Sequence, residues 1–316
     1  MAWRHLNPPP TCATLEAQFG LSSTSDGASI LHSPELVDGV LRCGCARCAA
    51  WSSYVKGPPA ADGGPGVHPK YLVLTAELVD LLARWLRSQR HALVGSSAEL
   101  RILEVGAGSG ALTAALKNAF RDEPQIQIAA TDSYARELVR VDGLVGRLPY
   151  EEALRVYAPQ IVLCAWMPLG DDWTAAFRAA PSVSHYVLLG EVDDGCCGQP
   201  WKTWGYLAAD ARDDTCSVPS TSSEDDDDEE DGGGGGGGDA GRGEGWRRVW
   251  EHRPEATPFG ADGWARRELP ELSKVLLGCT DEPWLAARRS KAVLFSRGAS
   301  LLLTGGVREE VARWLG

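Results

Sequence analysis

The chain has 316 residues, of which 44% are hydrophobic and 23% are charged, and its formal net charge at pH 7 is −12. Eight acids stand in one run at residues 224–231, which leaves −4 on the rest of the chain and no basic stripe. This distribution argues against a nucleic-acid-binding surface. Because no run of about 18 or more apolar residues is present, we expect no membrane span.

The nine cysteines are odd in number and irregular in position. They indicate reduced thiols in an intracellular, cytoplasmic protein rather than a disulfide framework. The first 20 residues lack the pattern of a secretory signal. They contain little arginine for an organelle transit peptide, but they also contain few acids, so targeting to an organelle remains an alternative.

Residues 1–69 form an N-terminal extension, expected to be partly disordered, with a proline run and a Ser/Thr/Gly patch before residue 35. Its thiols Cys43, Cys45 and Cys48 could ligate zinc with one of three residues as the fourth ligand: Cys12, His32 or His68. The usual pair of C-x-x-C sets with a spacer is absent. We therefore interpret them as cysteines in a small turn or under a loop, with no bound metal, and expect well under one equivalent of zinc in purified protein.

A folded domain is predicted over residues 70–298. It opens with a helix in which Leu74, Leu78 and Trp85 recur at helical spacing, with Thr75 as N-cap and Glu77 in the first turn. This helix is expected to pack on a sheet.

A glycine loop follows a short buried strand that ends at Val105. Gly106, Gly108 and Gly110 occupy alternate positions, and residues 111–120 then have helical spacing. Glycines permit a tight turn and a close approach of ligand to backbone, while free N–H groups at the helix start face that ligand. The pattern predicts a nucleotide-type cofactor site or, alternatively, a purely structural turn.

Glu104 helps to decide which of two kinds of nucleotide-binding protein the glycine loop indicates. Gly106, Gly108 and Ala111 loosely satisfy the dinucleotide fingerprint G-x-G-x-x-G/A. An acid two residues before the first glycine suits a cationic ligand better than a pyrophosphate. Glu-x-Gly-x-Gly-x-Gly resembles the first motif of the class I S-adenosylmethionine-dependent methyltransferases, which implies a loop that cradles the methionine and ribose end of that cofactor. An NAD(P)-dependent oxidoreductase and a non-catalytic cofactor-binding scaffold remain alternatives.

Asp132 ends the second strand, predicted over residues 125–131, and stands 22 residues beyond Gly110. This is close to the spacing at which an acid reaches the ribose hydroxyls in sheets of this type. A carboxylate can accept from both hydroxyls. The alternative is that Asp132 only makes a local turn.

Adenine recognition is expected after a third strand at 144–148. The resemblance implies an acid there for the adenine amino group, but Pro149 and Tyr150 occupy the place. Tyr150 is therefore expected to offer stacking or backbone contacts instead.

The loops after the next two strands are the expected acceptor side. After the continuous apolar strand 160–165 come Trp166 and Pro168, which could form an apolar wall, although a core tryptophan is an equal alternative. In similar enzymes that methylate exocyclic amines of nucleobases, Asn/Asp-Pro-Pro-Tyr often stands at this place. Its absence here argues against such amines as the methyl acceptor. After strand 186–191, three residues are candidates to face substrate because functional residues concentrate at such strand ends: Asp193, Asp194 and Trp201. Asp193, Asp194 and His185 are possible bases, and no catalytic residue is assigned.

A disordered insertion is predicted at residues 217–245, which contain the acidic run and seven consecutive glycines. Deleting 221–245 and joining the ends with a short Gly/Ser link is expected to leave the melting temperature within a few degrees. The segment offers only Ala240 for burial, and long loops add little closure entropy. Thermal denaturation measures this, and a large loss of stability would show that the segment packs.

Two last strands are predicted near 272–277 and 291–296, followed by a tail, residues 299–316, with a short helix at 307–315. Five alternating strands with right-handed crossovers plus this antiparallel pair predict an α/β fold with a doubly wound, mostly parallel, seven-stranded sheet, the Rossmann-like methyltransferase fold. The resemblance implies S-adenosylmethionine as cofactor and methyl transfer to an acceptor. The acceptor and the oligomeric state stay open.

Overall fold

The computed structural model describes residues 8–21, 31–37, 40–57, 70–95, 98–133, 143–208, 246–285 and 288–298. The predicted insertion and the predicted tail helix lie outside these ranges. Within them, none of the helices is both long and apolar enough to cross a membrane.

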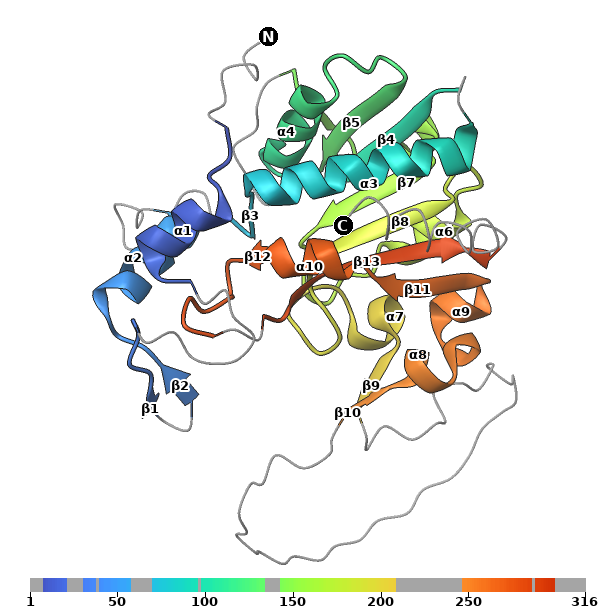
Figure 1. Cartoon of the computed structure of the whole chain (residues 1–316). Helices are drawn as coiled ribbons and strands as arrows, with labels where there is room; N and C mark the ends of the chain where they lie inside the picture. The colour runs from blue at the N-terminus through green and yellow to red at the C-terminus, as the bar shows by residue number, and fades with distance from the viewer. Residues whose placement is uncertain are drawn as a thin grey trace, which may run out of the picture.

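One sheet organises the domain (Figure 1). Among the described residues it has seven strands, in the order β11 (Trp264–Glu268), β13 (Ser290–Arg297), β8 (His185–Glu191), β7 (Ile161–Ala165), β4 (Leu100–Val105), β5 (Ile126–Asp132) and β6 (Val145–Arg147). Neighbouring strands from β8 to β6 are parallel. Strand β13 is antiparallel to both of its neighbours. The predicted fold class is confirmed.

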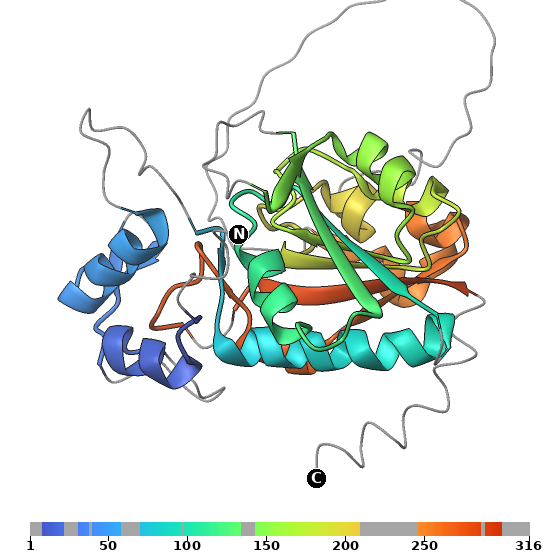
Figure 2. The same ribbon diagram turned by 90° about the horizontal axis from the view of Figure 1, so that it is seen from above.

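Helices cover both faces of the sheet, as Figure 2 shows from above. One face packs against α3 (Ala76–Val94), α4 (Ala111–Ala119) and α10 (Pro270–Val275). The other face packs against α5 (Tyr150–Tyr157), α6 (Thr174–Ala179), α7 (Pro200–Trp204) and α9 (Pro258–Ala261). Strands covered on both faces need apolar residues at nearly every position, which explains the continuous apolar run of β7.

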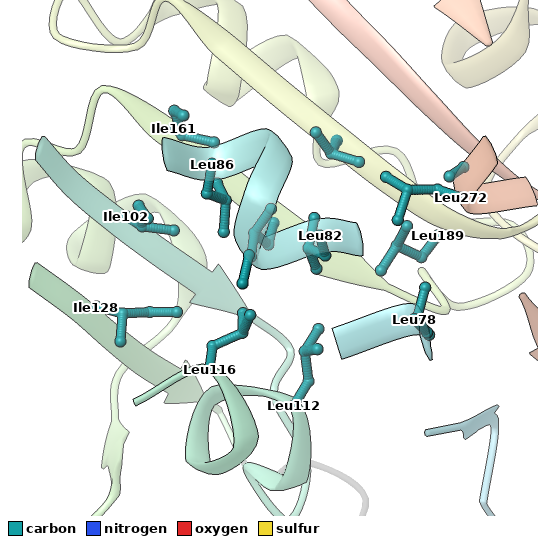
Figure 3. Close-up of a cluster of buried hydrophobic side chains, with 14 of the residues drawn as sticks. Leu78, Leu82, Leu86, Ile102, Leu112, Leu116, Ile128, Ile161, Leu189 and Leu272 are labelled. Atoms are coloured by element: carbon teal, nitrogen blue, oxygen red, sulfur yellow. The ribbon is translucent and has the colours of Figure 1, made fainter. Parts of the chain in front are cut away.

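The long helix α3 forms where its amphipathic pattern predicted it. Leu78, Leu82 and Leu86 recur every four residues, are fully buried, and belong to the same apolar cluster as Ile102 of β4 (Figure 3). Each such side chain contributes about 1.5–3 kcal/mol of transfer free energy. The Thr75 side chain accepts a hydrogen bond from Leu78 N at 3.1 Å, which confirms the predicted N-cap.

The prediction of a strand at 272–277 is wrong. Residues 270–275 form helix α10, which begins at Pro270 and packs against α3 and β13. A short apolar run is compatible with either a helix or a strand, and Pro at the first helical position favours the helix. The sixth strand of the sheet is instead β11, an edge strand whose polar residues carry no apolar signal.

The described segments on either side of the predicted insertion form a small antiparallel pair. Strand β9 (Tyr206–Ala208) pairs with β10 (Trp246–Arg248), and α8 (Val249–His252) and the 3₁₀ turn η3 (Pro254–Ala256) follow. This pairing places Ala208 opposite Trp246, so the chain between them leaves and re-enters the fold at one place.

An N-terminal module stands beside the sheet domain, at the left of Figures 1 and 2. It consists of α1 (Cys12–Phe19), the hairpin β1 (Glu35–Val37) and β2 (Val40–Arg42), and α2 (Ala46–Lys56). Helix α1 lies where the sequence predicted little independent structure. Its Leu15 and Phe19 are buried against Trp51 of α2 and against the strand pair β3 (Leu72–Val73) and β12 (Leu277–Gly278), so tertiary contacts stabilise it.

Candidate functional site

The glycine loop lies at the carboxyl end of β4, in the middle of the sheet. Strand β5 pairs with one side of β4 and β7 with the other. The chain therefore reverses its direction of travel across the sheet at β4. In open α/β sheets the ligand crevice lies at this switch point, outside the carboxyl ends of the strands.

The loop requires its glycines. Gly106, Gly108 and Gly110 have φ of +63°, +53° and +76°, a region that side chains with a Cβ rarely adopt. A Cβ on Gly106 would lie 2.8 Å from the Trp173 ring, and one on Gly110 would lie 2.5 Å from Val145 Cγ2. The turn is therefore tight and closely packed on both sides.

Glu104 is buried beneath this loop and holds the start of α4. Its Oε2 accepts hydrogen bonds from the backbone N–H, at 3.0 Å, and the hydroxyl of Thr113. Burial, and to a smaller extent the nearby charge of Asp132, raise the pKa of Glu104 to about 7 against the opposing effect of the bonds from Thr113. The side chain is thus close to half ionised at neutral pH. A neighbouring cation would favour its ionised form.

Asp132 lies on the other side of the loop, at the end of β5. Its Oδ2 accepts from the Gly108 N–H at 2.8 Å. Strands β4 and β5 are paired through Val105 and Thr131, so the two acids end on adjacent strands. The structure therefore brings together Glu104, the three glycines and Asp132, as the sequence predicted.

An aromatic pair lies next to the loop, and the sequence did not single out one of its two members, Trp173. Trp173, at the start of α6, stacks on Tyr150 with ring centroids 5.1 Å apart and an interplanar angle of 18°. Trp173 is also the residue that a Cβ on Gly106 would strike. Tyr150 therefore does stack, but on Trp173. Only the fold could place Trp173, which follows β7 by eight positions, against a glycine that follows β4.

The loops after β7 and β8 are tied to each other by hydrogen bonds. Gly198 N donates to Met167 O at 3.2 Å, and Gly170 N donates to Gly198 O at 3.0 Å. The carboxylate of Asp172 accepts from the Thr203 hydroxyl at 3.0 Å. The two predicted acceptor-side loops thus hold each other in place at the carboxyl edge of the sheet.

Trp166 is held in an unusual backbone conformation at the end of β7. Its φ is +64°, and its N–H donates to Leu189 O at 2.7 Å. The half-buried ring stacks on Tyr71 at 6.3 Å and lies against Gly278 of β12, where a Cβ would approach it to 2.5 Å. Strained positions of this kind persist only where the surroundings impose them. Pro168, two residues later, is also half-buried.

Asp193 takes part in a buried ion-pair network. One carboxylate oxygen lies 3.2 Å from Arg266 Nη2 and the other 3.2 Å from Arg248 Nε. Burial raises the pKa of Asp193, and the two arginines oppose the shift. Arg266 is itself buried and stacks 3.8 Å above the Trp250 ring, and burial lowers its pKa to about 10. Both carboxylate oxygens of Asp193 are therefore engaged by arginines.

The remaining predicted substrate-side residues and the possible base lie at different places in the fold. Asp194 is exposed beside the ion pair, and Trp201 is half-buried in the first turn of α7. The interpretation of His185 as a possible base is wrong, because it lies at the amino end of β8, about 20 Å of strand away from the carboxyl edge. There it is buried and bonds to Ser184 O and the Gln89 side chain.

Glu191, at the carboxyl end of β8, is a further buried acid on the predicted acceptor side. It accepts from Cys196 N at 2.9 Å and from the Thr280 hydroxyl. The sequence singled out the loop that begins after Glu191. It did not single out Thr280, because Thr280 lies in a segment with no motif of its own.

No protein-family model matches the chain, and no curated protein matches it. Among solved structures it is similar to the DszA carbon methyltransferase, at 13% identity over 78% of this chain and 57% of that one, with a TM-score of 0.36. It is similar to the S-adenosylmethionine-dependent methyltransferase of Agrobacterium tumefaciens at 9% identity over 87% and 72%, with a TM-score of 0.32. The CurJ carbon methyltransferase matches at 14% identity over 36% of this chain, with a TM-score of 0.27. The chain spans 57% and 35% of the two carbon methyltransferases.

Proposed function

We propose that this chain, which has the Rossmann-like methyltransferase fold, binds S-adenosylmethionine at the glycine loop and transfers its methyl group to an acceptor. The observation that carries the proposal is the buried acid Glu104 under a glycine loop at the switch point of the sheet. An acid at this place suits a cationic amino acid end and is awkward beside a pyrophosphate.

The order of strands supports the same choice. Dinucleotide-binding sheets have the parallel order 3-2-1-4-5-6. In this chain an antiparallel strand, β13, stands between β8 and the edge strand β11, so the sheet departs from that order. The oxidoreductase alternative explains neither the antiparallel strand β13 nor an acid at position 104.

The residues present fit the cofactor. Asp132 accepts from Gly108, and a carboxylate has about four acceptor sites, so this bond does not exhaust its capacity for ribose hydroxyls. Glu104 would face the ammonium group, and the backbone of Gly106, Gly108 and Gly110 would form the floor. When bound, the sulfonium supplies an already activated methyl group for in-line displacement. The chain then needs to position the acceptor and exclude water rather than to activate the donor.

On the acceptor side, we place Trp166, Pro168, Asp194 and Trp201 around the entering nucleophile. The hydrogen bonds between the loops after β7 and β8 support this, because they join both loops at the carboxyl edge of the sheet, where the glycine loop also lies. Asp193 would act there as a positioning residue through its arginines. The acceptor is left as an unassigned nucleophile, and no general base is named.

Calorimetry with S-adenosylhomocysteine, S-adenosylmethionine and NAD tests the proposal. The parent is expected to bind the first two and not NAD. Asp132→Ala removes a charge-assisted hydrogen bond, about 1.5–3 kcal/mol, which should weaken the affinity for S-adenosylhomocysteine about ten- to a hundred-fold. Gly108→Val should weaken it as well, by placing a branched side chain where the ligand approaches the backbone.

Asp122→Ala is the matched control, since Asp122 is an exposed acid beyond α4 that pairs with the exposed Arg121. It should leave the affinity unchanged, and circular dichroism confirms that each variant folds. Parent-like binding by folded Asp132→Ala and Gly108→Val proteins would contradict the site. Binding of NAD that is lost in Asp132→Ala would favour the oxidoreductase, and cofactor binding without methyl transfer to a panel of acceptors would favour the scaffold.

A further inference from the structure

Four side chains of the N-terminal module converge on one point. His32, Cys43, Cys45 and Cys48 each direct one ligand atom there, and these atoms all lie within 4.8 Å of one another. The His32 Nδ1 atom is 3.3 Å from the sulfurs of Cys45 and Cys48 and 3.9 Å from that of Cys43. The four residues come from three places: the loop before β1, the end of β2, and the start of α2.

These distances match the edges of a metal-centred tetrahedron. With Zn–S bonds of about 2.3 Å and Zn–N bonds of about 2.0–2.1 Å, nitrogen and sulfur ligands stand about 3.6 Å apart. The three measured distances from His32 Nδ1 lie on both sides of this value. The cluster is therefore already arranged for coordination.

Hydrogen bonding alone leaves the arrangement unexplained. His32 Nε2 lies 3.1 Å from the carbonyl oxygen of Gly20, which can only accept, so Nε2 carries the proton. In the neutral ring Nδ1 then has a single lone pair, yet three thiols approach it. One lone pair cannot accept from three donors, whereas one cation at the centre of the group would engage all four ligand atoms.

The Gly20 carbonyl is the outer partner that metal-bound histidines usually have, and it fixes both the tautomer and the ring orientation. Gly20 ends α1 with φ +71°, and a Cβ there would lie 2.9 Å from His32 Nε2. The end of α1 is thus fitted closely to the ring. His32 and Cys48 are buried and Cys43 and Cys45 are half-buried, as in a small closed site.

We propose that the N-terminal module contains a structural zinc ion bound by Cys43, Cys45, Cys48 and His32. Three thiolates and one imidazole are a donor set that suits zinc, and four protein ligands leave no open position for catalysis. This reverses the interpretation of the cysteines from sequence, which assigned them no metal. The proposal does not depend on the methyltransferase function.

The zinc would stabilise the surface on which the module meets the sheet domain. Trp51 of α2 donates from Nε1 to Asp281 O at 2.8 Å and packs with Leu277 of β12. The next residue, Gly278, is the one that lies against the Trp166 ring. Loss of zinc should therefore loosen the module first and the contact with the acceptor-side loop after it.

Metal analysis by mass spectrometry of protein purified under reducing conditions without added zinc tests the site. The full chain should contain about one zinc per molecule. A mercurial reagent that blocks thiols should release this zinc to a coloured indicator. Cys48→Ser should lose most of the zinc, whereas the matched control Cys12→Ser, a thiol of the same module outside the cluster, should keep it.

If Cys48→Ser does not fold, cobalt exchange on the parent decides the question. Cobalt bound by three thiolates and one imidazole should show tetrahedral d–d bands and sulfur-to-cobalt charge-transfer absorption. A parent that contains no zinc and gives no such spectrum would overturn the proposal. Zinc retained by folded Cys48→Ser protein, or a disulfide among Cys43, Cys45 and Cys48 in the reduced preparation, would overturn it equally.

Discussion

Asp193→Ala is expected to lower the free energy of unfolding by about 3–5 kcal/mol, because it leaves a buried arginine without its counter-ion. The Arg266 side chain is 4% exposed and that of Asp193 is 10% exposed, so water compensates little for the lost charge. The second partner, Arg248, is 53% exposed and can turn to solvent. Urea denaturation of the parent and the variant measures the difference.

Asp194→Ala is the matched control, since it removes the neighbouring acid at an exposed position. Surface substitutions usually change stability by less than about 0.5 kcal/mol. The double variant Asp193→Ala/Arg266→Met should recover much of the loss, because it removes both charges and keeps an apolar stem over Trp250. A stable Asp193→Ala protein that binds cofactor but has lost activity would instead make Asp193 a proton acceptor.

Glu104→Gln is expected to move stability and cofactor affinity in opposite directions. The pKa of Glu104 rises from 4.5 to about 7 through burial. Below pH 4.5 the carboxyl is protonated in both the folded and the unfolded chain. Between pH 4.5 and 7 only the unfolded chain releases the proton, so the parent loses stability as the pH rises, by about 3 kcal/mol in total at 1.36 kcal/mol per pH unit. The variant escapes this loss and should be the more stable protein at pH 8, with little difference at pH 4.5.

Affinity should change the other way. A cationic ammonium group binds the ionised form of Glu104, so the parent's affinity for S-adenosylhomocysteine should fall by up to about tenfold per pH unit below pH 7. Glu104→Gln should bind about ten- to a hundred-fold more weakly than the parent at pH 8 and lack this pH dependence. Calorimetry between pH 5.5 and 8 and denaturation at pH 4.5 and 8 measure both effects.

A purely structural Glu104 gives a different result. Because its carboxylate already accepts from Thr113 at the start of α4, it could act only as a helix cap. Gln can keep that acceptor, so the stability of the variant would still rise at pH 8. Its affinity for S-adenosylhomocysteine would then equal that of the parent at every pH, and the cofactor role would be contradicted.

The amino-acid sequence by itself determined the centre of the domain. The strand that ends at Val105, the three glycines and helix α4 follow from local properties: apolar runs, helical spacing, and backbone angles that only glycine adopts readily. The same local logic predicted the Thr75 N-cap and the position of Asp132 at a strand end. Parallel pairing of β4 and β5 then places Asp132 beside the loop without further information.

Only the tertiary structure decided which side chains become partners. Asp193 meets Arg266 across 73 positions of sequence, and the edge strand that carries Arg266 has no apolar pattern that could predict it. His32 becomes the fourth member of the cysteine cluster because α1 ends at Gly20 and orients its ring, a contact that spacing between cysteines does not encode. Local conformation depends on neighbours in sequence, whereas ion pairs, metal ligands and stacked rings depend on which distant surfaces the packed core brings together.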